Sequence, residues 1–365
     1  MLRESAIAGI LKEYISLALL KGVDFAVCSL PGENEFHFFL PEFAESSPSE
    51  GCSGNKVFEI GRWLAPYSDR ISIAGEVKPQ PALVFLQSLP CKEIRSDATL
   101  PAPTNSTGYN EYICALKEII KSCSKREGKT VFSRVICGEL DPEATWEDIF
   151  IELCDTHPDT FRFIFHSEQT GAWMGATPET LLDVDFSSGR FATMAFAGTR
   201  KQVDADTPWD QKNIRENRFV SEFLQERIKS FGLVPEVSEF ETVRYGTEIE
   251  HLCRCIHGNL GNVPYPRIID AINPTPALCG TPKEAAIVDI ERFERHNRGC
   301  YGGYVGLASP HKLRTFATLR CCHFSGNDLC IYAGGGITPD SVPEKEWHET
   351  EAKSTFFQRY LLRKV

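Results

Sequence analysis

The feature that most limits the fold is the way in which strand-like segments follow one another without a helix between them. Such segments succeed each other within residues 161–196 and again within 236–260. A further pair, 313–324 and 329–333, is joined by the turn Ser325-Gly-Asn-Asp328. Consecutive strands with short connections form hairpins, whereas parallel strands need a long crossover, usually a helix. We therefore predict an α+β protein built on mainly antiparallel sheets.

Hydrophobic periodicity and turn residues place the individual elements. We expect helices at 1–22, 111–125, 145–154 and 208–230, and two more that open with capping boxes at Thr281/Glu284 and Ser341/Glu344. We expect strands at 23–30, 35–40, 56–60, 82–86, 129–135, 161–166, 172–176, 190–196, 236–260, 313–324 and 329–333. Segments 46–54 and 90–110, rich in Ser, Pro and polar residues, are expected to be a loop and a connection.

Composition excludes several classes of protein. The chain has 365 residues, a net charge of -11 and a pI near 5.4, which argues against nucleic-acid and anionic-membrane partners. No apolar run is long enough to span a bilayer, since charges interrupt the amphipathic segment 1–22. The 14 cysteines lack zinc-ligand spacing and suggest free thiols in a reducing compartment. We expect a cytoplasmic monomer or homodimer.

The stretch 333–353 carries the densest group of candidate site residues. Three consecutive glycines, Gly334 to Gly336, permit close approach of backbone amides to a ligand. On the helix that follows, Glu346, Glu349 and Lys353 are spaced to share one face. Bare amides, carboxylates and an ammonium would suit a polyanion held partly through a metal ion. The alternative is a surface turn followed by a solvated acidic helix.

Other candidates are ambiguous when taken singly. Alternation places Arg320 on an apolar strand face, where a guanidinium needs an anion, from either a ligand or a structural salt bridge. Glu216 resembles a solvated helix position, and Lys129 a charge at a strand edge. Glu179 resembles an acid at a helix N-terminus. Spacing along the chain cannot show whether any of these residues lie close together in the folded protein.

Taken together, however, six blocks resemble one family. In chain order they are Gly175-Ala-Thr-Pro-Glu179, Ala197-Gly-Thr-Arg200, Asn273-Pro-Thr-Pro-Ala277, Tyr301-Gly-Gly-Tyr-Val-Gly306, Arg320 and 333–353. They resemble the chorismate-utilising enzymes, which include isochorismate, salicylate, anthranilate and aminodeoxychorismate synthases. The resemblance covers about 110–365 and leaves 1–105 as a variable part. It implies one domain over 1–365, with antiparallel sheets stacked at its centre and helices outside, like anthranilate synthase component I.

The resemblance also implies a set of ligands. Mg²⁺ would be bound by Glu216 and Glu349, with Glu346 acting behind them or through water, and would hold the ring carboxylate of chorismate. The substrate-binding residues would be Gly198, Thr199, Asn273, Tyr301, Arg320, Gly334, Gly336 and Lys353. Among these, Arg320, Tyr301 and the amides near Gly334 and Gly336 would take the enolpyruvyl carboxylate, with Lys353 adding charge.

The identity of a few residues separates the members of the family. The block that contains Lys129 resembles the one in which isochorismate and salicylate synthases carry a general-base lysine. Anthranilate synthases have a glutamine at that position. Ala197 stands where aminodeoxychorismate synthases carry a nucleophilic lysine. We therefore predict an isochorismate synthase that needs no glutaminase subunit, with Lys129 as base and Glu179 as acid, serving menaquinone or siderophore synthesis. Asn273 replaces the usual histidine, so a proton-relay role there is in doubt while a positioning role remains.

Three alternatives stay open at this point. A salicylate synthase would share both catalytic residues and would go on to eliminate pyruvate. An ammonia-using synthase is disfavoured by Lys129 and Ala197. A protein of a different class, one that binds chorismate without turning it over, is disfavoured by the intact set of carboxylates and lysines.

Overall fold

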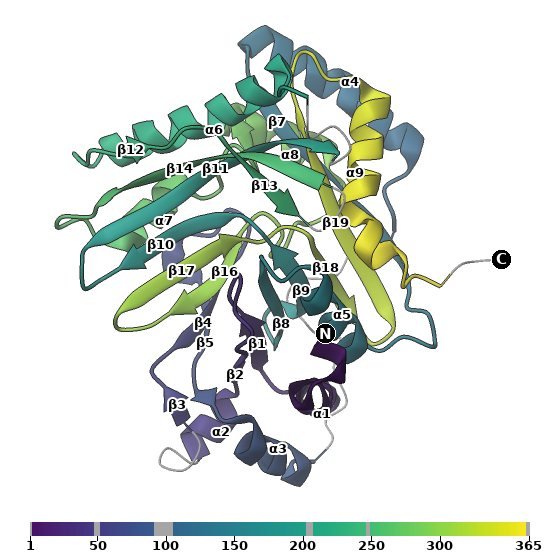
Figure 1. Ribbon diagram of the computed structural model, residues 1–365. Helices are drawn as coiled ribbons and strands as arrows, with labels where there is room; N and C mark the ends of the chain where they lie inside the picture. The colour runs from purple at the N-terminus through teal and green to yellow at the C-terminus, as the bar shows by residue number, and fades with distance from the viewer. Residues whose placement is uncertain (1, 47–51, 91–104, 202–206, 246–248, 363–365) are drawn as a thin grey trace.

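Two antiparallel sheets packed face to face form the centre of the molecule, and the helices lie outside them (Figure 1). The computed structural model describes residues 2–46, 52–90, 105–201, 207–245 and 249–362. Every pairing between the strands of these residues is antiparallel, as predicted from the succession of strand-like segments. The loop expected at 46–54 and the connection expected at 90–110 fall largely outside the described residues.

The first sheet has ten strands among the described residues, in the order β15-β7-β19-β18-β9-β8-β1-β2-β6-β3. Their bounds are β1 (Phe25–Ser29), β2 (His37–Phe39), β3 (Cys52–Gly54), β6 (Glu76–Val77), β7 (Lys129–Glu139), β8 (Phe161–Ser167), β9 (Gly171–Thr177), β15 (Gly280–Thr281), β18 (Cys321–Ser325) and β19 (Asp328–Ile337). The long β7–β19 ladder brings Gly336 opposite Val131, so the glycine run lies beside the start of β7.

The second sheet runs β12-β14-β11-β10-β17-β16-β4-β5, with β13 also paired to β14. Its strands are β4 (Val57–Gly61), β5 (Ile71–Ile73), β10 (Thr180–Asp185), β11 (Arg190–Lys201), β12 (Glu236–Val237), β13 (Glu241–Tyr245), β14 (Ile249–Asn259), β16 (Tyr304–Ala308) and β17 (Lys312–Ala317). Strands from the first 80 residues thus belong to both sheets.

The helices cover the outer faces. They are α1 (Ala6–Lys21), α2 (Pro41–Ser46), α3 (Pro79–Ser88), α4 (Tyr109–Arg126), α5 (Trp146–Thr156), α6 (Gln211–Lys229), α7 (Tyr265–Ile272), α8 (Lys283–Phe293) and α9 (Pro343–Gln358), with short 3-10 turns at Leu2–Glu4 and Tyr67–Asp69. Helix α6 packs on β11 and β14 of the second sheet, while α9 packs on β19 of the first. No helix of the described residues is long and apolar enough to cross a bilayer.

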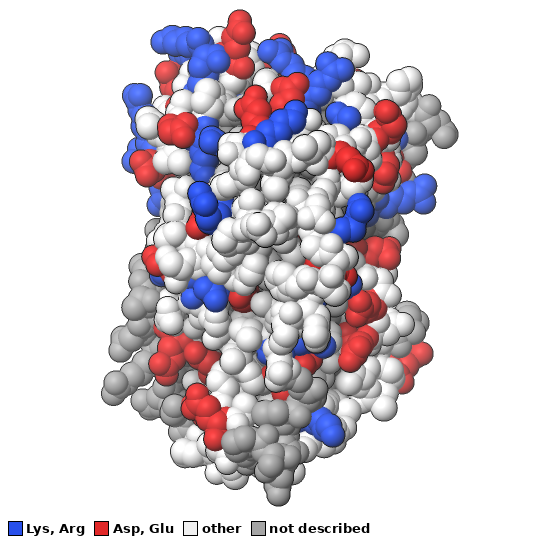
Figure 2. Space-filling model, turned by 90° about the vertical axis from the view of Figure 1, so that its left-hand side faces the viewer, with Lys and Arg blue, Asp and Glu red and all other residues white. Residues whose placement is uncertain are grey.

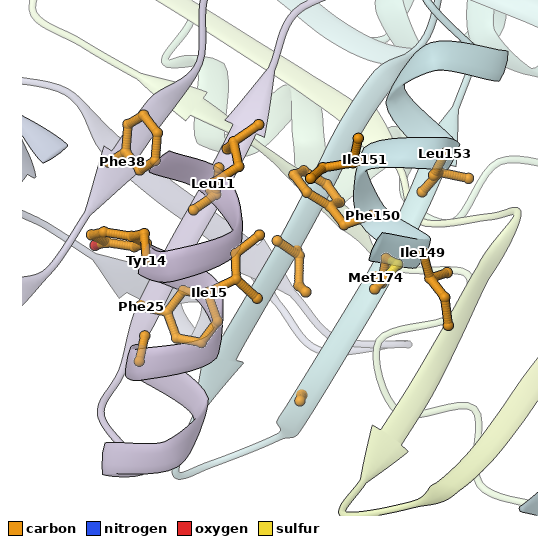
Figure 3. Packing of buried hydrophobic residues seen from close by; sticks show 14 of the residues in the cluster. Leu11, Tyr14, Ile15, Phe25, Phe38, Ile149, Phe150, Ile151, Leu153 and Met174 are labelled. Atoms are coloured by element: carbon orange, nitrogen blue, oxygen red, sulfur yellow. The ribbon is translucent and has the colours of Figure 1, made fainter. Parts of the chain in front are cut away.

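Alternation along β8 shows how the core is layered. Phe161, Phe163 and Phe165 point into the space between the sheets, where the Phe161 ring stacks on Phe316 of β17 at 4.5 Å. Ile164, between them in sequence, points to the other face of the first sheet. There it joins the cluster in which α1 and α5 pack through Leu11, Ile15 and Phe150, among others (Figure 3).

On the face shown in Figure 2, Lys and Arg side chains of the described residues are interspersed with Asp and Glu. The structure describes the side chains of twelve cysteines, and nine of these are buried.

Three local predictions were wrong. Residues 82–86 lie inside α3, not in a strand, because their apolar side chains Ala82, Leu83 and Leu86 cover one helical face. Neither predicted capping box forms. Helix α8 begins after Pro282 and α9 after Val342, and neither first residue is capped by a side chain.

Candidate functional site

A cavity lies where the two sheets and helix α6 meet. Its empty volume is about 620 Å³, part of which is open to solvent. Nine of the residues singled out in the sequence line it: Glu179, Gly198, Thr199, Glu216, Tyr301, Arg320, Gly334, Gly336 and Lys353. They come from both sheets and from two helices, which explains why spacing along the chain could not group them.

Lys129 sits directly behind this wall. It begins β7, it is 1 % exposed, and its Nζ lies 2.8 Å from Oε1 of Glu216 on α6. Gly336 lies against this pair, since a Cβ at this position would meet Glu216 Oε1 at 2.2 Å and Lys129 Cε at 2.6 Å. The glycine therefore leaves room for an ion pair next to the ligand space.

Glu179 lies between β9 and β10 in the wall of the same cavity. Its backbone carbonyl accepts a hydrogen bond from Ala317, which fixes the segment to the end of β17. The side chain is 1 % exposed, and burial raises its pKa to about 8 against the opposing effects of Lys129 and a hydrogen bond from Thr275. Glu179 is therefore a neutral, proton-carrying acid at pH 7, not the solvated helix-end acid of the alternative reading.

Arg320 does not lie on a strand face, contrary to the alternation argument. It sits in the gap between β17 and β18, where the chain passes from the second sheet to the first, and adopts a left-handed φ of 52°. Its backbone carbonyl accepts a hydrogen bond from Ala176 of β9. This crossing point, which no strand periodicity reveals, brings the guanidinium into the cavity wall.

His251 on β14 was missed by the sequence analysis. Its Nε2 lies 3.2 Å from Arg320 Nη2 and must accept, because a guanidinium can only donate. The proton then resides on Nδ1, which lies 3.2 Å from Thr199 Oγ1 and 3.3 Å from the carbonyl of Gly198. Burial, reinforced by Arg320, holds the pKa of this imidazole well below its usual value. No pattern in the start of β14, Ile249-Glu-His-Leu-Cys253, distinguishes this histidine from a structural one.

Three carboxylates from two helices converge beside the cavity, and each has a lysine partner. Glu216 pairs with Lys129, Glu346 with Lys212 at 2.8 Å, and Glu349 with Lys353 at 2.6 Å. Lys353 also donates to the carbonyl of Gly334 at 2.9 Å, which ties α9 to the glycine run. The predicted common face of Glu346, Glu349 and Lys353 is thus directed at the site, not at solvent.

Electrostatic effects differ within this group. Burial, with Glu349 nearby, raises the pKa of Glu346. Burial also favours the neutral form of Glu349, but Lys353, Lys212 and Arg320 together outweigh it and lower the pKa of that carboxyl.

The donor set fits a hard divalent cation such as Mg²⁺, which prefers carboxylate oxygens. Glu346 is 1 % exposed, and its Oε2 has no hydrogen-bond partner among the described residues. A buried carboxylate oxygen without a partner is costly unless a cation or water satisfies it. Glu216, Glu346 and Glu349 are the residues that could hold such an ion.

Among the predicted substrate-binding residues, Asn273 alone is not in the cavity wall. It ends α7, and its side chain is not among those that line the cavity. Its carbonyl accepts a hydrogen bond from Lys283 at 2.8 Å. The same segment instead contributes Ala277 and Leu278 to the wall and Thr275 to Glu179.

Two stacked antiparallel sheets with a carboxylate and lysine site at their junction define the class of protein. The chain belongs to the family described as "Chorismate binding enzyme", whose sequence profile matches residues 34–362. The resemblance seen in the six sequence blocks is thereby confirmed. The match begins well before residue 105, in the region whose strands enter both sheets.

Particular relatives are similar over part or all of the chain. The sequence is 29% identical to isochorismate synthase MenF of Haemophilus influenzae over 221 residues, 57% of this chain and 50% of that protein. The chain thus spans about half the length of this curated relative. The fold matches MenF, the menaquinone-specific isochorismate synthase from Escherichia coli, with a TM-score of 0.72 at 20% identity, over 95% of this chain and 91% of that one. Anthranilate synthase component I of Streptococcus pneumoniae gives 0.63 at 17% identity, over 92% and 90%, which confirms the predicted fold.

Proposed function

We propose that this protein is an isochorismate synthase, which adds water at C2 of chorismate and expels the hydroxyl group at C4. One observation carries the proposal. A buried lysine and a buried, protonated glutamate lie at the same cavity: Glu179 lines it, and Lys129 pairs with Glu216, which also lines it. That pairing supplies a base and an acid at one ligand site, as water addition coupled to hydroxide loss requires.

Glu179 would act as the acid. Because burial raises its pKa to about 8, the carboxyl keeps its proton at neutral pH and can give it to the departing hydroxyl. Thr275, 3.4 Å from Oε1, would orient the carboxyl for this transfer.

Lys129 would take a proton from the attacking water. Its Nζ lies 2.8 Å from Glu216 Oε1, which connects the base to the proposed ion site. When bound, Mg²⁺ would supply positive charge that neutralises the protein carboxylates and the ring carboxylate of the substrate. Glu216 and Glu349 would hold it, with Glu346 as a supporting acid.

Arg320 would bind the second carboxylate of the substrate. A guanidinium binds a carboxylate through two hydrogen bonds. His251 accepts from this guanidinium, and the N–H of Ala176 holds the backbone carbonyl of Arg320. Lys353 and the amides of the glycine run lie in the same wall and would add donors.

Residue identity favours water over ammonia as the nucleophile. Lys129 is the residue that the resemblance assigns to the water-using members, and Ala197 lines the cavity where ammonia-dependent aminodeoxychorismate synthases carry a lysine. The name of the Haemophilus influenzae relative agrees with this assignment. Isochorismate would then feed menaquinone or siderophore synthesis.

A product assay tests the proposal. Purified protein with chorismate and Mg²⁺, in the absence of ammonia, should accumulate isochorismate, as followed by chromatography. Salicylate with an equal amount of pyruvate would assign the protein to the salicylate synthases. Turnover that depends on ammonia and yields anthranilate would refute the role of Lys129, and binding without turnover would refute enzymatic activity. Chelation of Mg²⁺ should stop the reaction reversibly.

A further inference from the structure

Lys212 lies among the three carboxylates but has no place in the chemistry proposed above. It precedes Glu216 by one turn of α6, so both side chains leave the helix on the same face. Its ammonium reaches across to α9 and donates to Glu346 Oε1 at 2.8 Å. It does not line the cavity.

The charges of the cluster balance before any ion binds. Glu216, Glu346 and Glu349 carry three negative charges, and their partners Lys129, Lys212 and Lys353 carry three positive ones. Two of these lysines have roles toward the substrate in the proposed function. Lys212 is the lysine of the three that has no role toward the substrate and interacts with the carboxylates.

Its environment supports this assignment. Burial alone would lower the pKa of Lys212, but Glu346, Glu216 and Glu349 together raise it above its ordinary value. The ammonium therefore interacts favourably with all three acids at once. Without it, Glu346 would be an uncompensated buried carboxylate beside two others, which is strongly unfavourable.

We propose that Lys212 takes the place of the divalent cation in the metal-free protein: it holds Glu346 and keeps the carboxylates together, and it weakens the binding of the free ion. The inference rests on the proposed metal site. Lys212 is then a positioning residue that acts through Glu346. Its charge stabilises the three carboxylates in the absence of the ion, but it also repels an incoming cation and so weakens cation binding.

Calorimetric titration of Mg²⁺ into the metal-free protein, without substrate, tests the second half of the claim. The variants are K212M, which removes the charge, and K212Q, which keeps a donor for Glu346 while removing the charge. Both should bind Mg²⁺ at least about tenfold more tightly than wild type, because a positive charge near the ion has been removed. K229M, a matched lysine change at an exposed position of the same helix, should bind like wild type.

Thermal denaturation tests the first half. In chelator, K212M and K212Q should melt below wild type, and saturating Mg²⁺ should restore most of the difference. Equal or weaker Mg²⁺ binding by both variants would overturn the proposal. So would variants that remain unfolded even with Mg²⁺, because the ion should replace the ammonium. A wild type that binds no Mg²⁺ would instead refute the proposed cofactor, which the product assay tests separately through chelation.

Discussion

The raised pKa of Glu179 makes the substitution E179Q informative about both catalysis and stability. Glutamine keeps the shape of a neutral glutamic acid but can neither donate a carboxyl proton nor ionise. Loss of a general acid costs about 10²–10⁴ in rate, so turnover of chorismate should fall by at least about 100-fold while the substrate still binds.

The effect on stability follows from the pKa values. In the unfolded chain the carboxyl ionises near its ordinary value of 4.5, whereas in the folded protein burial holds the pKa at about 8. A folded-state pKa above the unfolded one adds stability that is complete below 4.5 and is lost as the pH rises through about 8. Each pKa unit is worth about 1.4 kcal/mol, so wild type should lose up to about 5 kcal/mol across this window through Glu179 alone. E179Q lacks this loss.

Urea unfolding of both proteins at several pH values from 5 to about 9 measures the difference. The stability of E179Q relative to wild type should increase steadily with pH and level off above about 8. E222Q, a glutamate change at an exposed position of α6, should follow the wild-type pH dependence. A constant difference across the range would refute the raised pKa, and a variant with more than about a tenth of wild-type turnover would remove Glu179 from the mechanism.

Three further substitutions test other parts of the site. G336A should abolish turnover, by about 100-fold or more, with little change in melting temperature, because the new Cβ would displace the flexible ends of Glu216 and Lys129 rather than backbone. R320K should raise KM for chorismate by about tenfold with a smaller effect on kcat, since a lysine cannot grip a carboxylate through two bonds; an unchanged KM in steady-state kinetics would place that carboxylate elsewhere. E349Q should weaken Mg²⁺ binding by about tenfold or more in calorimetry; unaltered binding would exclude Glu349 as a ligand.

The sequence was sufficient for the fold class because local patterns report it. Hairpin turns and alternating strands such as 161–166 depend on neighbours along the chain, so they can be predicted without knowledge of tertiary contacts. The prediction of a strand at 82–86 was wrong because a short apolar stretch is compatible with both a buried strand and one face of a helix. The capping boxes failed because the residues were present but both helices began one residue later than the pattern required.

The site was accessible only in part. Family resemblance supplied Lys129, Glu179 and Glu216, whose proximity depends on strand order and could not be read from spacing. His251 and Thr275 were missed because their roles come from contacts with partners 69 and 96 residues away. Such contacts become visible only once both sheets are assembled.

The lysine and glutamate pairs have one more consequence. Helix α6 rests on the second sheet, while α9 and β7 belong with the first, so the pairs Lys212–Glu346 and Lys129–Glu216 both fasten one layer of the sandwich to the other. An ion bound by Glu216 and Glu349 would also connect the two layers, because these residues lie on α6 and α9. Substitutions that weaken packing between the sheets, for instance at the Phe161–Phe316 stack, should therefore lower the affinity for the cation although they lie away from it. Binding of the cation should in turn stabilise the packing of the two sheets.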